Sequence, residues 1–143
     1  MTGERHNKKF YYSLIEEWFE NYCDVEYLSC EVNKCGNVVV ALYHNKAIYL
    51  LGECYRTIMY APKIMFSIFE NRRLHIDDVL MKTDNVGNGS IAMRALLKYS
   101  KNHNVKKITG YLSTADNSHK ARRNHYYEKF GFSVYESNVV LEL

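Results

Sequence analysis

The sequence predicts an α/β or α+β fold, in which strands form one sheet and helices pack against it. Short segments rich in β-branched and aromatic residues recur along the chain, and such segments are typical of strands. Longer segments with apolar residues at every third or fourth position lie among them and are typical of amphipathic helices. Helices that alternate with strands indicate a sheet covered by helices.

The length and composition predict one folded domain over residues 1–143. A chain of 143 residues is long enough to bury a core, and 47% of its residues are hydrophobic while only one is proline. No apolar run approaches the roughly 20 residues that span a bilayer. Residues 1–10 are polar and basic, without the hydrophobic stretch of a signal peptide. We therefore expect a cytoplasmic protein that does not associate with membranes.

The first half of the chain is expected to contain one helix and at least three strands. The helix covers residues 8–22, because apolar residues recur there at fourfold spacing: Phe10, Leu14, Trp18 and Tyr22. Strands are expected at 27–32, 38–43 and 47–51. Residues 56–71 fit either a short helix that Pro62 opens or a strand with a loop, and the sequence leaves both possibilities open.

The second half gives clearer signals. A strand at 74–81 is followed by a turn with two glycines and by a helix that ends near His103. A strand at 107–112, a helix at about 118–130 and two short strands at 132–135 and 139–143 complete the expected order.

The turn after the strand at 74–81 is suited to bind phosphate. Gly87 and Gly89 lack a Cβ, so the main chain can curl and approach an anion closely. The helix that follows offers unpaired N–H groups and the positive end of its dipole. The net charge of +3 is mild, but eight Lys or Arg stand between residues 98 and 129 against two acids, Asp116 and Glu128. These features predict a phosphorylated ligand.

Two known phosphate motifs match this turn poorly. A Walker P-loop requires a lysine directly after its last glycine, and none follows here. A dinucleotide-binding turn requires G-x-G-x-x-G or A, which Gly87, Gly89 and Ala92 match. This turn comes past the middle of the chain, however, and the strand before it carries Asp77 and Asp78 rather than a continuous apolar run. A small Rossmann-type nucleotide-binding domain stays as an alternative.

A second motif lies one helix and one strand beyond the turn. Asn117 is followed there by Tyr127 and by the pair Gly131-Phe132. Together with the two glycines, this order resembles the GNAT superfamily of acyl-CoA N-acyltransferases, in which Q/R-x-x-G-x-G/A precedes N-x-x-A-x-x-x-Y-x-x-x-G-F. Asp84 stands where that family prefers Gln or Arg. The resemblance covers residues 74–135.

The resemblance implies a mixed, mostly antiparallel twisted sheet with helices on both faces and a splayed central strand pair. It implies acetyl-CoA (coenzyme A) as cofactor, with the diphosphate on the backbone of the turn and the acyl arm between the strands at 74–81 and 107–112. Lys120, Arg122 and Arg123 fit either the cofactor's 3′-phosphate or a solvent-facing role. The expected cofactor contacts are Leu80, Met81, Val86, Gly87, Asn88, Gly89, Ser90, Asn117, Lys120 and Tyr127.

The resemblance also implies catalytic roles. Tyr127 is the expected general acid for the departing thiolate, and its neighbour Tyr126 is the residue most easily confused with it. The general base is expected to be Asp77 or Asp78. Alternation along a strand would send these two side chains to opposite faces, so that at most one faces the site. Weaker candidates for the base are His75, His125 and Glu53.

The predicted function is an N-acetyltransferase that moves an acetyl group from acetyl-CoA to a primary amine of a small molecule or peptide, by direct attack in a ternary complex. The alternative is a CoA-binding or regulatory module without catalysis. Nucleic acid is not the expected partner, because no base-stacking motif accompanies the basic residues. A homodimer is a possible assembly of the chain. The four cysteines lack C-x-x-C or zinc-type spacing, so we expect no metal site and buried, reduced thiols.

Overall fold

The computed structural model describes residues 2–53, 55, 57–81, 87–112 and 117–143. Within these residues the first elements are α1 (Thr2–Asn21), β1 (Glu26–Val32), β2 (Val38–His44), β3 (Ala47–Leu51) and β4 (Lys63–Phe69). They are followed by β5 (Arg73–Leu80), α2 (Asn88–Asn102), β6 (Lys107–Tyr111), α3 (Asn117–Glu128), β7 (Ser133–Val134) and β8 (Asn138–Glu142). The elements expected from periodicity are confirmed, and the undecided segment at 56–71 contains the strand β4.

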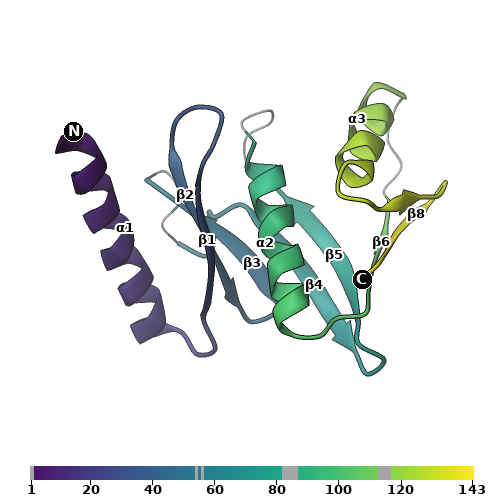
Figure 1. Cartoon of the computed structure of the whole chain (residues 1–143), viewed down its shortest axis with the longest axis horizontal. Helices are drawn as coiled ribbons and strands as arrows, with labels where there is room; N and C mark the ends of the chain where they lie inside the picture. Colours follow the sequence, from purple (N-terminus) through teal and green to yellow (C-terminus); the bar gives the residue numbers. More distant parts are fainter. Residues whose placement is uncertain (1, 54, 56, 82–86, 113–116) are drawn as a thin grey trace.

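The strands form one eight-stranded sheet in the order β1-β2-β3-β4-β5-β6-β8-β7. All neighbouring strands are antiparallel except β5 and β6, which are parallel. Figure 1 shows α2 across the middle of this sheet, α1 beside the β1–β3 end and α3 beside the C-terminal strands. A Rossmann-type domain requires a parallel sheet, so the antiparallel pairing excludes that alternative.

Period-2 burial explains why residues 63–69 form a strand rather than a helix. Ile64 and Phe66 are buried, whereas Met65 and Phe69 are exposed. A strand needs this alternation because successive side chains point to opposite faces. Pro62 stands just before the strand, and its carbonyl accepts a hydrogen bond of 2.9 Å from the N–H of Leu50 on β3. Pro62 therefore directly precedes a strand here, although proline is also common at the first position of a helix.

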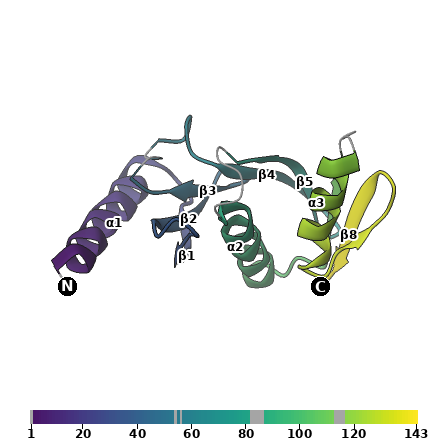
Figure 2. The same ribbon diagram turned by 90° about the horizontal axis from the view of Figure 1, so that it is seen from above.

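Two apolar cores lie on opposite faces of the sheet. One core joins α2, through residues such as Ile91 and Leu96, to the face of β3 that carries Ile48 and Leu50. The other joins α1 to the opposite face, where the tilted ring of Trp18 packs against Tyr49 with ring centroids 5.4 Å apart. Helices on both faces are thus confirmed, and Figure 2 shows α2 beneath the sheet, with α1 and α3 toward its two ends.

The central pair of parallel strands separates partway along its length. Residues 73–76 of β5 pair with residues 107–110 of β6, and the last pair is Ile76 with Gly110. β5 nevertheless continues to Leu80, still paired with β4. The end of β5 therefore has a partner on one side only, which confirms the expected splayed pair.

A β-bulge in β5 corrects the expectation for the two aspartates. Met65 pairs with Asp78, but the next residue of β4 pairs with Ile76, so Asp77 is the extra residue. The side chain of Asp77 accepts a hydrogen bond of 2.6 Å from Ser67, which lies on the same face of β4 as Met65. Both carboxylates therefore project from the face opposite α2, because a bulge breaks the strict alternation of a strand.

Two further observations concern the surface. Cys23, Cys30 and Cys35 are exposed, which contradicts the expectation of buried thiols, and Cys54 lies outside the described residues. Among the described residues no helix is long and apolar enough to cross a bilayer.

Candidate functional site

The N-terminus of α2 is shaped by two glycines with different roles. Gly87 precedes the helix with φ +88° and ψ 1°, a left-handed conformation that L side chains disfavour. Gly89 is needed because of a neighbour, since a Cβ there would lie 3.2 Å from Cε1 of Tyr126. Among the described residues the first turn of α2 holds no acidic side chain. Its N–H groups and dipole are thus available to an anion.

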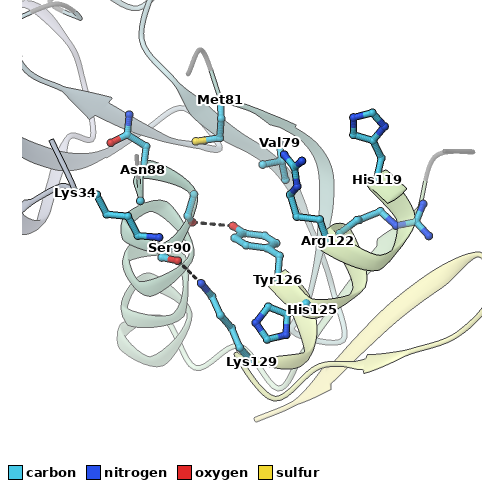
Figure 3. Close-up of a pocket in the computed structure, with 13 residues that line it drawn as sticks. Lys34, Val79, Met81, Asn88, Ser90, His119, Arg122, His125, Tyr126 and Lys129 are labelled. Carbon is cyan, nitrogen blue, oxygen red and sulfur yellow. Dashed lines mark hydrogen bonds between the residues drawn. The ribbon is translucent and has the colours of Figure 1, made fainter. Parts of the chain in front are cut away.

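A pocket of about 400 Å³ opens at this helix end. It lies between the first turn of α2, the inner side of α3, the end of β5 and the turn that joins β1 to β2 (Figure 3). Its lining residues are Lys34, Val79, Met81, Gly87, Asn88, Gly89, Ser90, His119, Arg122, Arg123, His125, Tyr126 and Lys129.

The pocket is strongly cationic. Four Lys or Arg side chains and two histidines line it, and no described lining residue is acidic. Elsewhere on α2 a cation does meet an acid: Arg94 pairs with Glu31 at 2.7 Å. Positive side chains near a helix N-terminus are unfavourable because they face the positive end of the dipole. The pocket is therefore electrostatically suited to a polyanion.

Two polar contacts fasten α3 to the first turn of α2. The hydroxyl of Tyr126 donates a hydrogen bond of 2.8 Å to the carbonyl of Gly89. The ammonium of Lys129 donates one of 2.6 Å to the hydroxyl of Ser90. Figure 3 shows both bonds along one side of the pocket. Tyr126 and Lys129 therefore set the distance between the two helices that wall the pocket.

Tyr127 lies deeper than its neighbour. Its side chain is 8% exposed and packs edge-on against Phe132, with ring centroids 5.4 Å apart. Burial raises the pKa of the Tyr127 hydroxyl above its usual value, the charge of Arg123 lowers it, and the charge of Asp78 raises it. Tyr127 is not among the described residues that line the pocket. The expected acid is therefore a buried hydroxyl on which the charges of Arg123 and Asp78 act in opposite directions.

The candidates for a general base differ in their surroundings. The carboxylate of Asp77 is engaged by Ser67, whereas that of Asp78 accepts a 2.9 Å hydrogen bond from the N–H of Val79 and acts on Tyr127. His75 shares a 2.8 Å hydrogen bond with Thr109 on β6.

The two remaining candidates for the base stand in different surroundings. His125 lines the pocket, and Glu53 is an exposed residue that follows β3. Asp78 is therefore the candidate whose charge acts on the Tyr127 hydroxyl.

The expected cofactor contacts divide into three groups. Met81 and the turn residues from Gly87 to Ser90 line the pocket, and so do Arg122 and Arg123. Leu80 and Lys120 are exposed residues outside the pocket lining. Val86 and the side chain of Asn117 lie outside the described part of the chain.

Lys34, Lys129 and Tyr126 line the pocket but were not predicted from the sequence as cofactor contacts. Lys129 stands in the second motif, directly after α3, so its position was available as a signal. Lys34 lies in the turn between β1 and β2, and no local pattern indicates that this turn meets a helix more than fifty residues later.

No protein-family model matches the chain. The uncharacterized protein YocC of Bacillus subtilis is 36% identical over 88 residues, which are 59% of this chain and 52% of that protein. The chain thus spans about half the length of the curated relative that it matches.

The sheet and helices are similar to those of solved acetyltransferases. A Bacillus anthracis structure assigned as a streptothricin acetyltransferase, in complex with acetyl coenzyme A, gives a TM-score of 0.52 at 13% identity and covers 89% of this chain and 92% of its own. An IAA acetyltransferase from Bacillus cereus gives a TM-score of 0.46 at 12% identity and covers 75% of this chain and 78% of its own. The order of elements, the splayed strand pair and the first of these likenesses agree: the chain has the fold of the GNAT acetyltransferases.

Proposed function

We propose that the chain is an acyl-CoA-dependent N-acyltransferase that uses acetyl-CoA and acetylates a primary amine of a small molecule or peptide. The observation that carries this proposal is the cationic pocket at the N-terminus of α2, whose described lining holds six basic or imidazole side chains and no carboxylate. Coenzyme A is a polyanion with a diphosphate in its middle, and helix N-termini bind such groups through backbone N–H donors.

The residues of the pocket fit the diphosphate. The residues from Gly87 to Ser90 line the pocket and offer backbone N–H donors there. Gly87 adds no side-chain bulk and adopts the left-handed conformation that begins the helix. Arg122 and Arg123 on α3 supply planar guanidinium groups that form paired hydrogen bonds with phosphate oxygens. The pocket therefore offers both backbone and side-chain donors to one anion.

The walls of the pocket lead toward the splayed strands. Val79 and Met81 line the pocket at the end of β5, beyond the last pair with β6. The cofactor supplies an acyl thioester when it is bound. Backbone groups at the end of β5 lack β6 as a partner and are therefore available to a ligand in the opening.

Two side chains are proposed to handle protons. Burial keeps the Tyr127 hydroxyl protonated at neutral pH, so that it can act as the proton donor of a general acid. Asp78 is exposed on β5, where a carboxylate can attract an ammonium and accept its proton. Acetyl-CoA is a metabolite of the cell interior, which agrees with the expected cytoplasmic location.

The experiment that tests this function combines binding with turnover. Calorimetric titration of the purified chain with coenzyme A should show a single site, and release of thiol from acetyl-CoA should depend on an added primary amine. A chain that binds no coenzyme A would contradict the proposal at its base.

The second candidate is a CoA-binding or regulatory module without catalysis. It is favoured by one observation: Tyr127 is buried and is not among the described residues that line the pocket. A chain that binds acetyl-CoA but releases no thiol with a broad panel of amines would support this module over the enzyme.

A further inference from the structure

The turn between β1 and β2, residues 33–37, is held against the N-terminus of α2. The side-chain carbonyl of Asn33 accepts hydrogen bonds from the N–H groups of Cys35 and Asn37, at 3.0 and 3.1 Å. The amide of the same side chain donates a bond of 3.2 Å to the side-chain oxygen of Asn88, the first residue of α2. Asn88 is only 2% exposed. One side chain, Asn33, thus shapes the turn and fixes it to the helix.

This fixation places Lys34 at the glycine turn. The Cγ of Lys34 lies 3.3 Å from the position that a Cβ on Gly87 would occupy, and its backbone N lies 3.7 Å from the same position. Lys34 lines the pocket, and Figure 3 shows its side chain directed toward the first turn of α2, near Ser90. The stem therefore runs along Gly87, and the ammonium reaches the helix end.

The position is unfavourable unless an anion shares it. Lys34, in the turn between β1 and β2, and Lys129, directly after α3, both line the pocket at the positive end of the same helix, and the described lining provides no carboxylate. A bound diphosphate would reverse the sign of both interactions, since charge-assisted hydrogen bonds to phosphate are the strong ones.

We infer that Lys34 binds the diphosphate of the cofactor, so that the β1–β2 turn forms a third wall of the phosphate site beside α2 and α3. Asn33 is a positioning residue that holds Lys34 there through Asn88. This inference rests on the proposed function, because it assumes that the pocket takes coenzyme A. It commits Lys34 to the diphosphate rather than to the 3′-phosphate, because the lysine stem lies along Gly87.

The test compares three ligands and three variants by calorimetry. The ligands are coenzyme A, dephospho-coenzyme A, which lacks the 3′-phosphate, and pantetheine, which lacks the nucleotide and its diphosphate. The variants are Lys34→Met, Lys34→Arg and Lys101→Met. Lys101→Met serves as a matched control. This substitution removes the same charge from the last turn of α2, at the far end of the helix.

Lys34→Met is expected to lower the affinity for coenzyme A and for dephospho-coenzyme A by the same factor. The factor should be about tenfold or more, as for the loss of one charge-assisted hydrogen bond. Pantetheine affinity should not change, and Lys34→Arg should restore most of the loss. Wild-type affinity in Lys34→Met, or a loss equal to that of Lys101→Met, would overturn the inference. Failure of the wild-type chain to bind coenzyme A would instead overturn the proposed function.

Asn33 is tested by a double-mutant cycle. Asn33→Ala should weaken coenzyme A binding when Lys34 is present and should have little further effect in the Lys34→Met background, because its contribution passes through the lysine. Equal losses in both backgrounds would mean that Asn33 acts through the stability of the turn alone and would overturn its positioning role. Unfolding curves of each variant show whether the fold is retained.

Discussion

The Tyr126 hydroxyl donates a hydrogen bond of 2.8 Å to the carbonyl of Gly89, and this bond joins α3 to the first turn of α2. The ring of Tyr126 also lies within 3.2 Å of the site where Gly89 would carry a Cβ. The absence of a side chain at residue 89 therefore serves two purposes. It leaves backbone N–H groups open to an anion, and it lets the helices approach closely enough to form one pocket.

A Gly89→Val variant should fold but lose coenzyme A binding. The branched side chain must push the Tyr126 ring away, because contacts of 3.2 Å are already tight for a single Cβ. Calorimetric titration with coenzyme A measures the effect, and Gly89→Ala should show a smaller loss. Wild-type affinity in a folded Gly89→Val variant would show that the turn does not hold the phosphate.

Tyr127→Phe should reduce turnover by about a hundredfold while coenzyme A affinity stays close to that of the wild type. The expected size is that of a positioned general acid, and Tyr127 is not among the described residues that line the pocket, so we expect cofactor binding to be independent of its hydroxyl. Steady-state rates of thiol release measure the change, with Tyr135→Phe as a control because Tyr135 is 58% exposed. An unchanged rate would remove Tyr127 from the mechanism.

The two aspartates of the bulge should behave differently when each is changed to asparagine. Asp78→Asn should lower turnover and move the alkaline limb of the rate profile to lower pH, because the Asp78 charge raises the pKa of Tyr127. Asp77→Asn should do neither, since its carboxylate is bound to Ser67. The measurement is the pH dependence of kcat for both variants. Equal profiles for the two variants would contradict the assignment of Asp78.

Ser90→Asp should separate stability from binding. An acidic residue in the first turn interacts favourably with the helix dipole and with Lys129, so the free energy of unfolding should rise by about 0.3–1 kcal/mol. The same charge should weaken coenzyme A binding by roughly tenfold or more, because it repels the diphosphate. Urea unfolding and calorimetry give the two numbers, and Ser90→Asn controls for shape. Tighter binding in Ser90→Asp would place the phosphates elsewhere.

The free energy of unfolding should fall as pH rises above 10. An unfolded tyrosine loses its proton near pH 10, whereas buried Tyr127 keeps its proton to higher pH because its pKa is raised. The folded state then binds more protons than the unfolded state, so stability decreases with pH. Unfolding curves at a series of alkaline pH values should show a shallower decrease for Tyr127→Phe than for the wild type. An identical decrease would mean that Tyr127 is not protected from titration.

Local patterns predicted most of the elements, because periodicity is a property of short segments. The strand at residues 47–51 was expected with its observed limits, although every residue of it is buried, since flanking turns mark its ends. Residues 63–69 stayed undecided because Pro62 is compatible with a helix start and a strand start alike. The bulge at Asp77 was not predictable, because it depends on the register with β4 rather than on the β5 sequence.

The site was predicted where it depends on one segment and missed where it depends on several. The turn from Gly87 to Ser90 carries its own signal, and so does the second motif around Tyr127. Lys34 lies at the site in a turn that the Asn33 amide fixes to Asn88, a contact between residues 55 positions apart. A single sequence contains no pattern for such a contact, since it arises from the way β1 and β2 lie beside α2.

The most direct test of the central claim is a crystal structure of the chain with acetyl-CoA. We expect diphosphate oxygens within hydrogen-bond distance of the N–H groups from Gly87 to Ser90, with Lys34 and the α3 arginines around them. Clear density for the cofactor with its diphosphate away from the N-terminus of α2 would contradict the account.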